Sequence, residues 1–196
     1  MKYRIILASA SKRRSKILKE CGIKHKVVVS GVSEEIDNRK SPKINVLLNA
    51  QAKGRKVASK YKQGFIVSAD TVVLVEKRLL GKPKTKKEAK EFLKLFSGKT
   101  LFVYTGLCVI DAKKGAAASG VEESKIYVKK LSSKEINKFV KIAVSHDKAG
   151  GFSIEGPGTF IFDDIQGSYY NILGLPMAKL NHLFKKLGVD LLEEVS

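Results

Sequence analysis

The chain has 196 residues, of which 38 are Lys or Arg and 19 are Asp or Glu, so its formal net charge is +19. Hydrophobic residues make up 43% of it, which excludes the combination of low hydrophobicity and high charge that keeps chains disordered. This length suits one globular domain over residues 1–196 with a sizeable core.

The sequence gives no sign of export or of membrane insertion. Its longest apolar stretches, such as residues 71–75 and 107–110, are far shorter than the roughly 18 residues that a membrane helix needs. The apolar run at residues 5–10 is too short for a secretory signal. Cys21 and Cys108 lie far apart and the three histidines are scattered, which disfavours a disulfide framework and a zinc site. We therefore expect a cytoplasmic protein without a membrane partner.

The excess positive charge favours an anionic partner such as a nucleotide, a nucleic acid or a phosphate surface. Most of the excess is lysine, spread along the chain in pairs such as Lys86-Lys87 and Lys185-Lys186. A nucleic-acid groove more often gathers its charges on one face, with aromatic residues between them. Dispersed surface charge is the favoured interpretation, and a basic nucleic-acid-binding module without catalysis is the alternative.

Apolar residues at strand spacing and at helix spacing alternate along the chain. In chain order we expect strand 4–7, helix 12–20, strand 25–30, helix 42–59, one strand or two within 65–75, helix 85–96, strand 101–110, strand 124–131, helix 132–143, strand 159–162 and helix 176–187. Turns are expected at residues 81–83 and 115–120, and a glycine-rich loop at residues 149–158. This alternation predicts an α/β fold in which at least part of the sheet is parallel.

Residues 7–14 form a strand end that leads into a helix start, with Ser11 as the helix cap. Free backbone N–H groups at a helix start bind anions, and Arg13 and Arg14 could add bidentate contacts to phosphate. The alternative is an ordinary cap followed by solvated basic residues.

Asp70 is a carboxylate at an otherwise apolar place in a strand. Such a group is costly to bury unless it is paired, hydrogen-bonded or bound to metal, so it could act as a general base or as a Mg²⁺ ligand. The alternative is a structural cap on a neighbouring turn. Glu34 and Glu35 form a second acidic pair, which would suit a metal if one of them faces Asp70 and is otherwise a solvated turn.

Two lysines occupy unusual places. Lys53 interrupts an apolar stripe of helix 42–59, and Lys82 lies in a Gly-Lys-Pro turn that could direct its charge inward. The alternative for each is a surface lysine, with Lys53 snorkelling to water.

The glycine-rich loop could approach a ligand closely through its backbone. Within residues 147–158, Glu155 could accept hydrogen bonds from the edge of a base. The loop lacks the residues of a Walker A or GxGxxG motif, so a plain turn is the alternative.

Short blocks along nearly the whole chain combine these features in one order. They are LASASKRR near the start, residues 50–53, SADTVV, GKP, FSGK followed by VYTG, and DKAGGFSIEG leading to GSYYNILGLP. Together they resemble the Maf family of nucleoside triphosphate pyrophosphatases. Two positions depart from the family pattern, since Lys12 stands where Pro is usual and Leu101 where His is usual.

The resemblance implies hydrolysis of (d)NTPs, with modified and pyrimidine nucleotides as candidates, between the α and β phosphates to a nucleoside monophosphate and pyrophosphate. It also implies a divalent cation (Mg²⁺ or Mn²⁺), two lobes of a mixed α/β fold around a cleft, and a homodimer. By this resemblance Asp70 accepts the proton of water, and Glu34 and Asp70 hold metal. The residues that would hold the substrate are Ser9, Arg13, Arg14, Lys53, Thr71, Lys82 and Glu155.

Three of these positions bear on base preference, and they disagree. Arg13 and Thr71 look like the branch of the family that prefers pyrimidine triphosphates, whereas Glu155 stands where such relatives tend to carry Gln. Because Gln donates and accepts hydrogen bonds while an ionised Glu only accepts, we expect a broader base preference than that of the strict pyrimidine enzymes.

Overall fold

One mixed β-sheet organises the computed structural model, which describes residues 3–142 and 149–195. The strands are β1 (Ile5–Leu7), β2 (His25–Val27), β3 (Phe65–Val75), β4 (Arg78–Leu80), β5 (Thr100–Asp111), β6 (Ala117–Val128) and β7 (Phe162–Gln166). Their order is β2-β1-β3-β5-β6-β7, with β4 paired to β3. β1 runs parallel to β2 and β3, and the other pairs are antiparallel. The expected partly parallel α/β sheet is confirmed.

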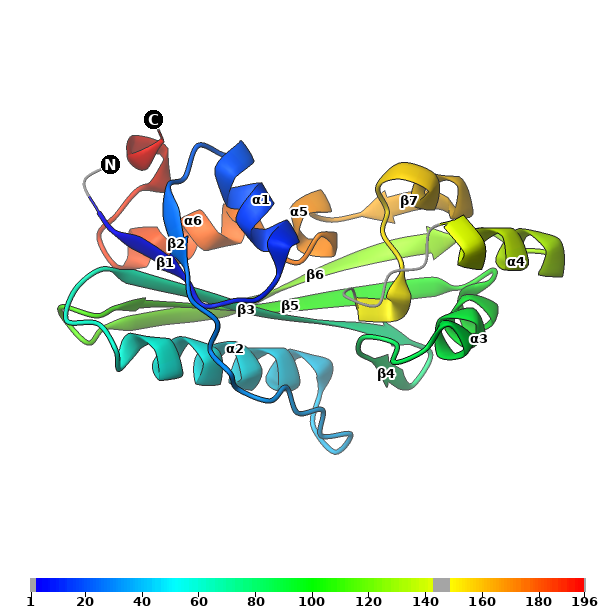
Figure 1. Ribbon diagram of the computed structural model, residues 1–196, viewed down its shortest axis with the longest axis horizontal. Helices are drawn as coiled ribbons and strands as arrows, with labels where there is room; N and C mark the ends of the chain where they lie inside the picture. Colours follow the sequence, from blue (N-terminus) through cyan, green and yellow to red (C-terminus); the bar gives the residue numbers. More distant parts are fainter. Residues whose placement is uncertain (1–2, 143–148, 196) are drawn as a thin grey trace.

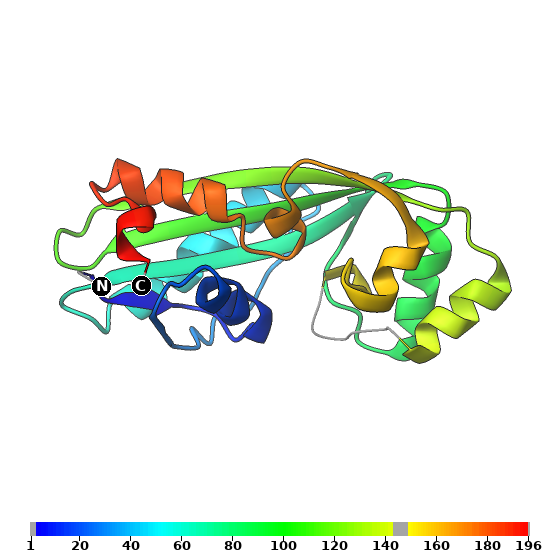
Figure 2. The same ribbon diagram turned by 90° about the horizontal axis from the view of Figure 1, so that it is seen from above.

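Helices lie on both faces of this sheet (Figure 1). They are α1 (Lys12–Glu20), α2 (Pro42–Ala58), α3 (Lys86–Phe96), α4 (Ser133–Ile142), α5 (Tyr169–Ile172) and α6 (Met177–Lys186), with 3₁₀ helices at Ala149–Gly151, Gly156–Ile161 and Leu191–Glu194. Figure 2 shows α1 and α6 near one end of the long strands and α3 and α4 near the other, which gives the expected two lobes. Among the described residues, no helix is both long and apolar enough to span a bilayer.

The helix α2 carries two apolar stripes, one with Val46, Ala50 and Val57 and one with Ile44 and Leu48, and it packs the first against the sheet. Val46 in this stripe is fully buried, whereas Ile44 and Leu48 of the other stripe are exposed. Gly106 of β5 allows the helix to come close, because a Cβ at this position would collide with the backbone of Val46. The helix therefore lies directly on the strands that carry the site described below.

The strand β3 is continuous, but its pairing on one side is not. β1 pairs with residues 65–67 and β4 pairs with residues 73–75. On the other side, β5 pairs along the whole of β3. Residues 68–72 of β3 therefore face an opening between β1 and β4, which we call the sheet gap.

Two expectations for the second half of the chain are wrong. The turn expected at residues 115–120 ends earlier, because β6 already begins at Ala117 and places Gly120 beside Leu183 of α6. The strand expected at residues 159–162 is mostly the 3₁₀ helix Gly156–Ile161, with a proline in its first turn, and β7 begins only at Phe162. The last residue of the expected helix 132–143, and residues 147–148, lie outside the described residues.

Candidate functional site

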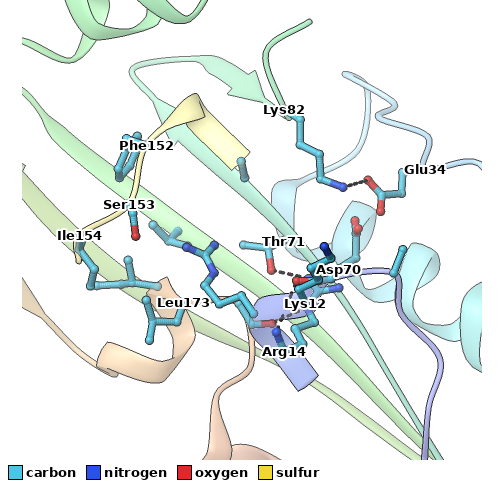
Figure 3. A pocket seen from close by; sticks show the side chains of 17 residues that line it. Lys12, Arg14, Glu34, Asp70, Thr71, Lys82, Phe152, Ser153, Ile154 and Leu173 are labelled. Atoms are coloured by element: carbon cyan, nitrogen blue, oxygen red, sulfur yellow. Dashed lines mark hydrogen bonds and ion pairs between the residues drawn. The ribbon is translucent and has the colours of Figure 1, made fainter. Parts of the chain in front are cut away.

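A cavity of about 420 Å³ opens at the sheet gap (Figure 3). Its walls come from the start of α1, from β3, from the turn after β4, from the loop between the first two 3₁₀ helices, and from the end of α5. These segments belong to both lobes, so the cavity corresponds to the expected cleft.

Asp70 lines this cavity and is nevertheless only 3% exposed. Its Oδ1 accepts a hydrogen bond from Nζ of Lys53 at 2.7 Å, and its Oδ2 accepts one from Nδ2 of Asn49 at 2.9 Å. Both partners come from α2 rather than from a neighbouring turn. The carboxylate therefore has the charged partner that its burial requires.

Lys53 is 4% exposed and lies between two carboxylates. Its Nζ donates to Oδ1 of Asp70 at 2.7 Å, to Oε1 of Glu34 at 2.8 Å and to the carbonyl of Ala69 at 3.3 Å. An ammonium group has three N–H donors, so all three are used within the protein. The alternative that Lys53 snorkels to water is therefore wrong.

Asn49 belongs to the site, although the sequence did not single it out. Besides its bond to Asp70, its Nδ2 donates to the carbonyl of Glu35 at 2.9 Å, and its Oδ1 accepts from the N–H of Glu35 at 3.3 Å. One side chain thus ties the acidic loop to the carboxylate on β3. The available signal was spacing, because Asn49 precedes Lys53 by four residues and so shares its face of α2.

Glu34 faces Asp70 across Lys53, which is the condition under which the acidic pair would suit a metal. Its Oε2 lies 3.8 Å from Nζ of Lys82, and Figure 3 shows these two side chains pointing toward each other. Partial burial raises the pKa of Glu34, but the neighbouring cations, above all Lys53, outweigh burial and hold this pKa below its ordinary value. Glu34 is therefore ionised at neutral pH.

Arg14 lines the cavity although it is largely buried, and most of its donors are used by the protein. Its Nε donates to the carbonyl of Gly174 at 2.8 Å. Its Nη1 donates to the carbonyl of Ala69 at 2.8 Å and to Oγ of Ser9 at 3.2 Å, and its Nη2 donates to Oγ1 of Thr71 at 3.0 Å. A guanidinium has five N–H donors, so one is left for a ligand. The bidentate phosphate contact expected of Arg14 is not available in this arrangement.

Burial lowers the pKa of the Arg14 guanidinium, and the charges of Asp70 and Glu34 oppose that effect. The side chain also closes part of the sheet gap, because it gives the carbonyl of Ala69 one of its hydrogen bonds. Arg14 therefore supports the local fold as well as the electrostatics of the cavity.

The remaining expected residues differ in their access to the cavity. Arg13, Thr71 and Lys82 line it, whereas Ser9 is buried behind Arg14. Glu155 is exposed and is not among the described lining residues.

Ser153, two residues before Glu155, and Lys12, at the start of α1, line the cavity instead. The hydroxyl of Ser153 donates to Oε2 of Glu155 at 3.3 Å. Glu155 therefore contacts a lining residue without lining the cavity itself. Lys12, which stands where the family usually has Pro, adds a further cation to the wall.

Comparison with known proteins agrees with the motifs. The family model described as Maf-like protein matches residues 4–187. The dTTP/UTP pyrophosphatase of Caldicellulosiruptor saccharolyticus is 39% identical over 194 residues, which cover 97% of this chain and 98% of the relative. Proteins of the same name from Dictyoglomus thermophilum and Methanosarcina barkeri are each 38% identical, over 98% and 97% of this chain and over 100% and 97% of their own lengths. The chain belongs to the Maf family.

Proposed function

We propose that this protein is a nucleoside triphosphate pyrophosphatase that hydrolyses the bond between the α and β phosphates, with dTTP and UTP among its substrates. The observation that carries the proposal is the buried Asp70 carboxylate, paired with Lys53, at a cavity whose wall carries Lys12, Arg13 and Lys82. The names of the similar proteins support the reaction and the pyrimidine substrates.

The chemistry requires water to attack a phosphorus atom that is shielded by negative oxygens. Cations on the cavity wall would hold the triphosphate and offset this charge. Asp70 accepts one hydrogen bond at each oxygen and each oxygen keeps a further lone pair, so the carboxylate can accept the proton of the attacking water. Lys53 and Asn49 would fix its orientation while it does so.

Glu34 and Asp70 are the residues that would hold a divalent cation, Mg²⁺ or Mn²⁺. Mg²⁺ usually binds one or two carboxylates and completes its shell with waters and phosphate oxygens. In residues 3–142 and 149–195, no cluster of three or more His, Cys, Asp or Glu side chains could hold a metal by itself, which fits a cation shared with the substrate. A bound cation would neutralise charge on the phosphates.

We also propose a cytoplasmic homodimer. The exposed apolar stripe of α2, where Ile44 and Leu48 are 46% and 43% exposed, supports association with a second copy. Light scattering of the purified protein tests this assembly, and a monomeric mass would contradict it.

A nucleic-acid partner is not expected, because the lysines are dispersed along the chain. Tight binding of duplex DNA with a steep salt dependence would contradict that expectation.

The substitution Asp70→Asn tests the proposed reaction. The amide is nearly isosteric but cannot accept the proton, so we expect turnover to fall by about 10²- to 10⁴-fold while the circular dichroism spectrum is unchanged. The assay measures pyrophosphate from dTTP, UTP, ATP and GTP with Mg²⁺ or Mn²⁺. Asp111→Asn is the matched control, because Asp111 is also buried but lies outside the described cavity lining. Near wild-type turnover of Asp70→Asn would contradict the assignment, and release of orthophosphate alone would contradict the reaction.

A further inference from the structure

A chain of hydroxyl groups leads from Arg14 into the core beneath the cavity. Thr71 on β3 and Thr105 on β5 are paired in register, and their Oγ1 atoms lie 3.0 Å apart. Thr71 accepts from Nη2 of Arg14 at 3.0 Å, and Oγ1 of Thr105 lies 3.2 Å from the carbonyl oxygen of Asn171. Thr105 is fully buried, so water does not compete for these bonds.

The ends of the chain determine the direction of its hydrogen bonds. A guanidinium can only donate, and a carbonyl can only accept. If Thr105 donates to Asn171, then Thr71 donates to Thr105, and both hydroxyl protons are used. In the reverse direction the oxygens of Thr105 and of the Asn171 carbonyl, 3.2 Å apart, would face each other with no proton between them, which is costly where Thr105 is fully buried.

The carbonyl that ends the chain is held in place by its own side chain. Asn171 is fully buried, and its Nδ2 donates to the carbonyl of Val103 at 3.0 Å and to Oγ of Ser124 at 2.9 Å. These bonds anchor α5 between β5 and β6. The block GSYYNILGLP contains Asn171, so this segment is connected to the cavity by the hydrogen bonds of Thr105 and Thr71.

We propose that Thr105 is a positioning residue that takes the proton of Thr71, so that Thr71 presents only lone pairs to Arg14 and to the cavity. Thr71 can then accept a hydrogen bond from a ligand but cannot donate one. The fully ionised phosphates of a nucleotide have no donor to offer, whereas the base and the sugar have N–H and O–H groups. Any hydrogen bond between Thr71 and a nucleotide is therefore one that the base or the sugar donates. This inference rests on the proposed function, because it concerns the same cavity.

Four variants test the inference. Calorimetry measures the affinity of each variant for dTTP and for inorganic triphosphate, which is a probe that lacks the nucleoside. Thr71→Val and Thr105→Val should each weaken dTTP binding by about tenfold, as expected for one net hydrogen bond. Inorganic triphosphate should bind all variants as it binds the wild type. Thr105→Ser keeps the hydroxyl, so its dTTP affinity should match the wild type although the lost methyl group lowers the unfolding temperature. The double valine variant should lose no more than Thr71→Val alone, because both act in one chain.

Several results would overturn the inference. They are unchanged dTTP affinity in Thr105→Val, losses that multiply in the double variant, and inorganic triphosphate weakened as much as dTTP. If Thr105→Val does not fold, Thr71→Val still decides between nucleoside and phosphate, and Thr105→Ser still separates the hydroxyl from packing. A wild type that binds dTTP but releases no pyrophosphate would refute the proposed reaction and leave this binding test valid.

Discussion

The buried ion pair between Lys53 and Asp70 offers the sharpest test of how the site is held. We expect Lys53→Met, which keeps most of the side-chain volume, to destabilise the protein strongly. Lys53 and Asp70 are 4% and 3% exposed, so the substitution leaves a buried carboxylate with Asn49 as its remaining side-chain partner. Removal of one member of a buried pair costs about 3–5 kcal/mol.

This free energy translates into a large thermal shift. For a chain of this size, a loss of 1 kcal/mol lowers the unfolding temperature by about 2–4 °C, so the variant should unfold about 6–20 °C below the wild type. The bond from Lys53 to Glu34 adds little to this figure, because the Glu34 side chain is 43% exposed and water screens it.

Thermal and urea unfolding of three variants measure the effect. Lys56→Met is the matched control, since Lys56 is exposed on the same helix and should change stability by no more than about 0.5 kcal/mol. The double variant Lys53→Met/Asp70→Asn removes both charges and should be more stable than Lys53→Met alone. If Lys53→Met unfolds at the wild-type temperature, or if the double variant is no more stable than the single one, the pair does not hold the site as described.

Two further substitutions probe Cys108 and Glu155. Burial raises the pKa of the Cys108 thiol to about 11, whereas an unfolded thiol ionises near pH 8.5, so stability from the protonated thiol is present below about pH 8.5 and is lost as the pH rises toward 11. Over that window Cys108→Ala should lose less stability than Cys21→Ala in urea unfolding, and equal pH slopes would argue against a shifted thiol. Glu155→Gln should raise activity on UTP and dTTP relative to purine triphosphates because Gln can also donate to a base; unchanged substrate ratios would show that the base is read elsewhere.

Local signals in the sequence were sufficient to predict those elements whose stability comes from contacts within the same segment. The helix α1 begins after the Ser11 cap as expected, because the cap and the apolar spacing act within one segment. The strand β4 and the helix α5 were not predicted, since elements of three and four residues depend on their neighbours for stability. The start of β6 was missed for the same reason, because its small residues gain their strand conformation from pairing with β5.

The site could be predicted from the sequence where a charged residue interrupts an apolar segment. Asp70 in a strand and Lys53 in an apolar stripe are anomalies that a sequence displays. Asn49 and Thr105 are ordinary residues for a helix and a strand, so only the three-dimensional arrangement reveals their partners. The contacts of Arg14 show the same limit, since they reach residues 55 and 160 positions away in the chain.

The three long strands beneath the cavity restrict how this protein can respond to a ligand. β3, β5 and β6 have 11, 12 and 12 residues and run without interruption from one group of helices to the other (Figure 2). A hinge between the lobes would have to break hydrogen bonds in all three strands at once, whereas hinges in proteins usually lie in a few loop residues. We therefore expect the two lobes to keep a fixed orientation relative to each other. We accordingly expect the loops and side chains at the rim to adapt to different nucleotides, and the distance between α6 and α3 to stay nearly the same when a ligand binds.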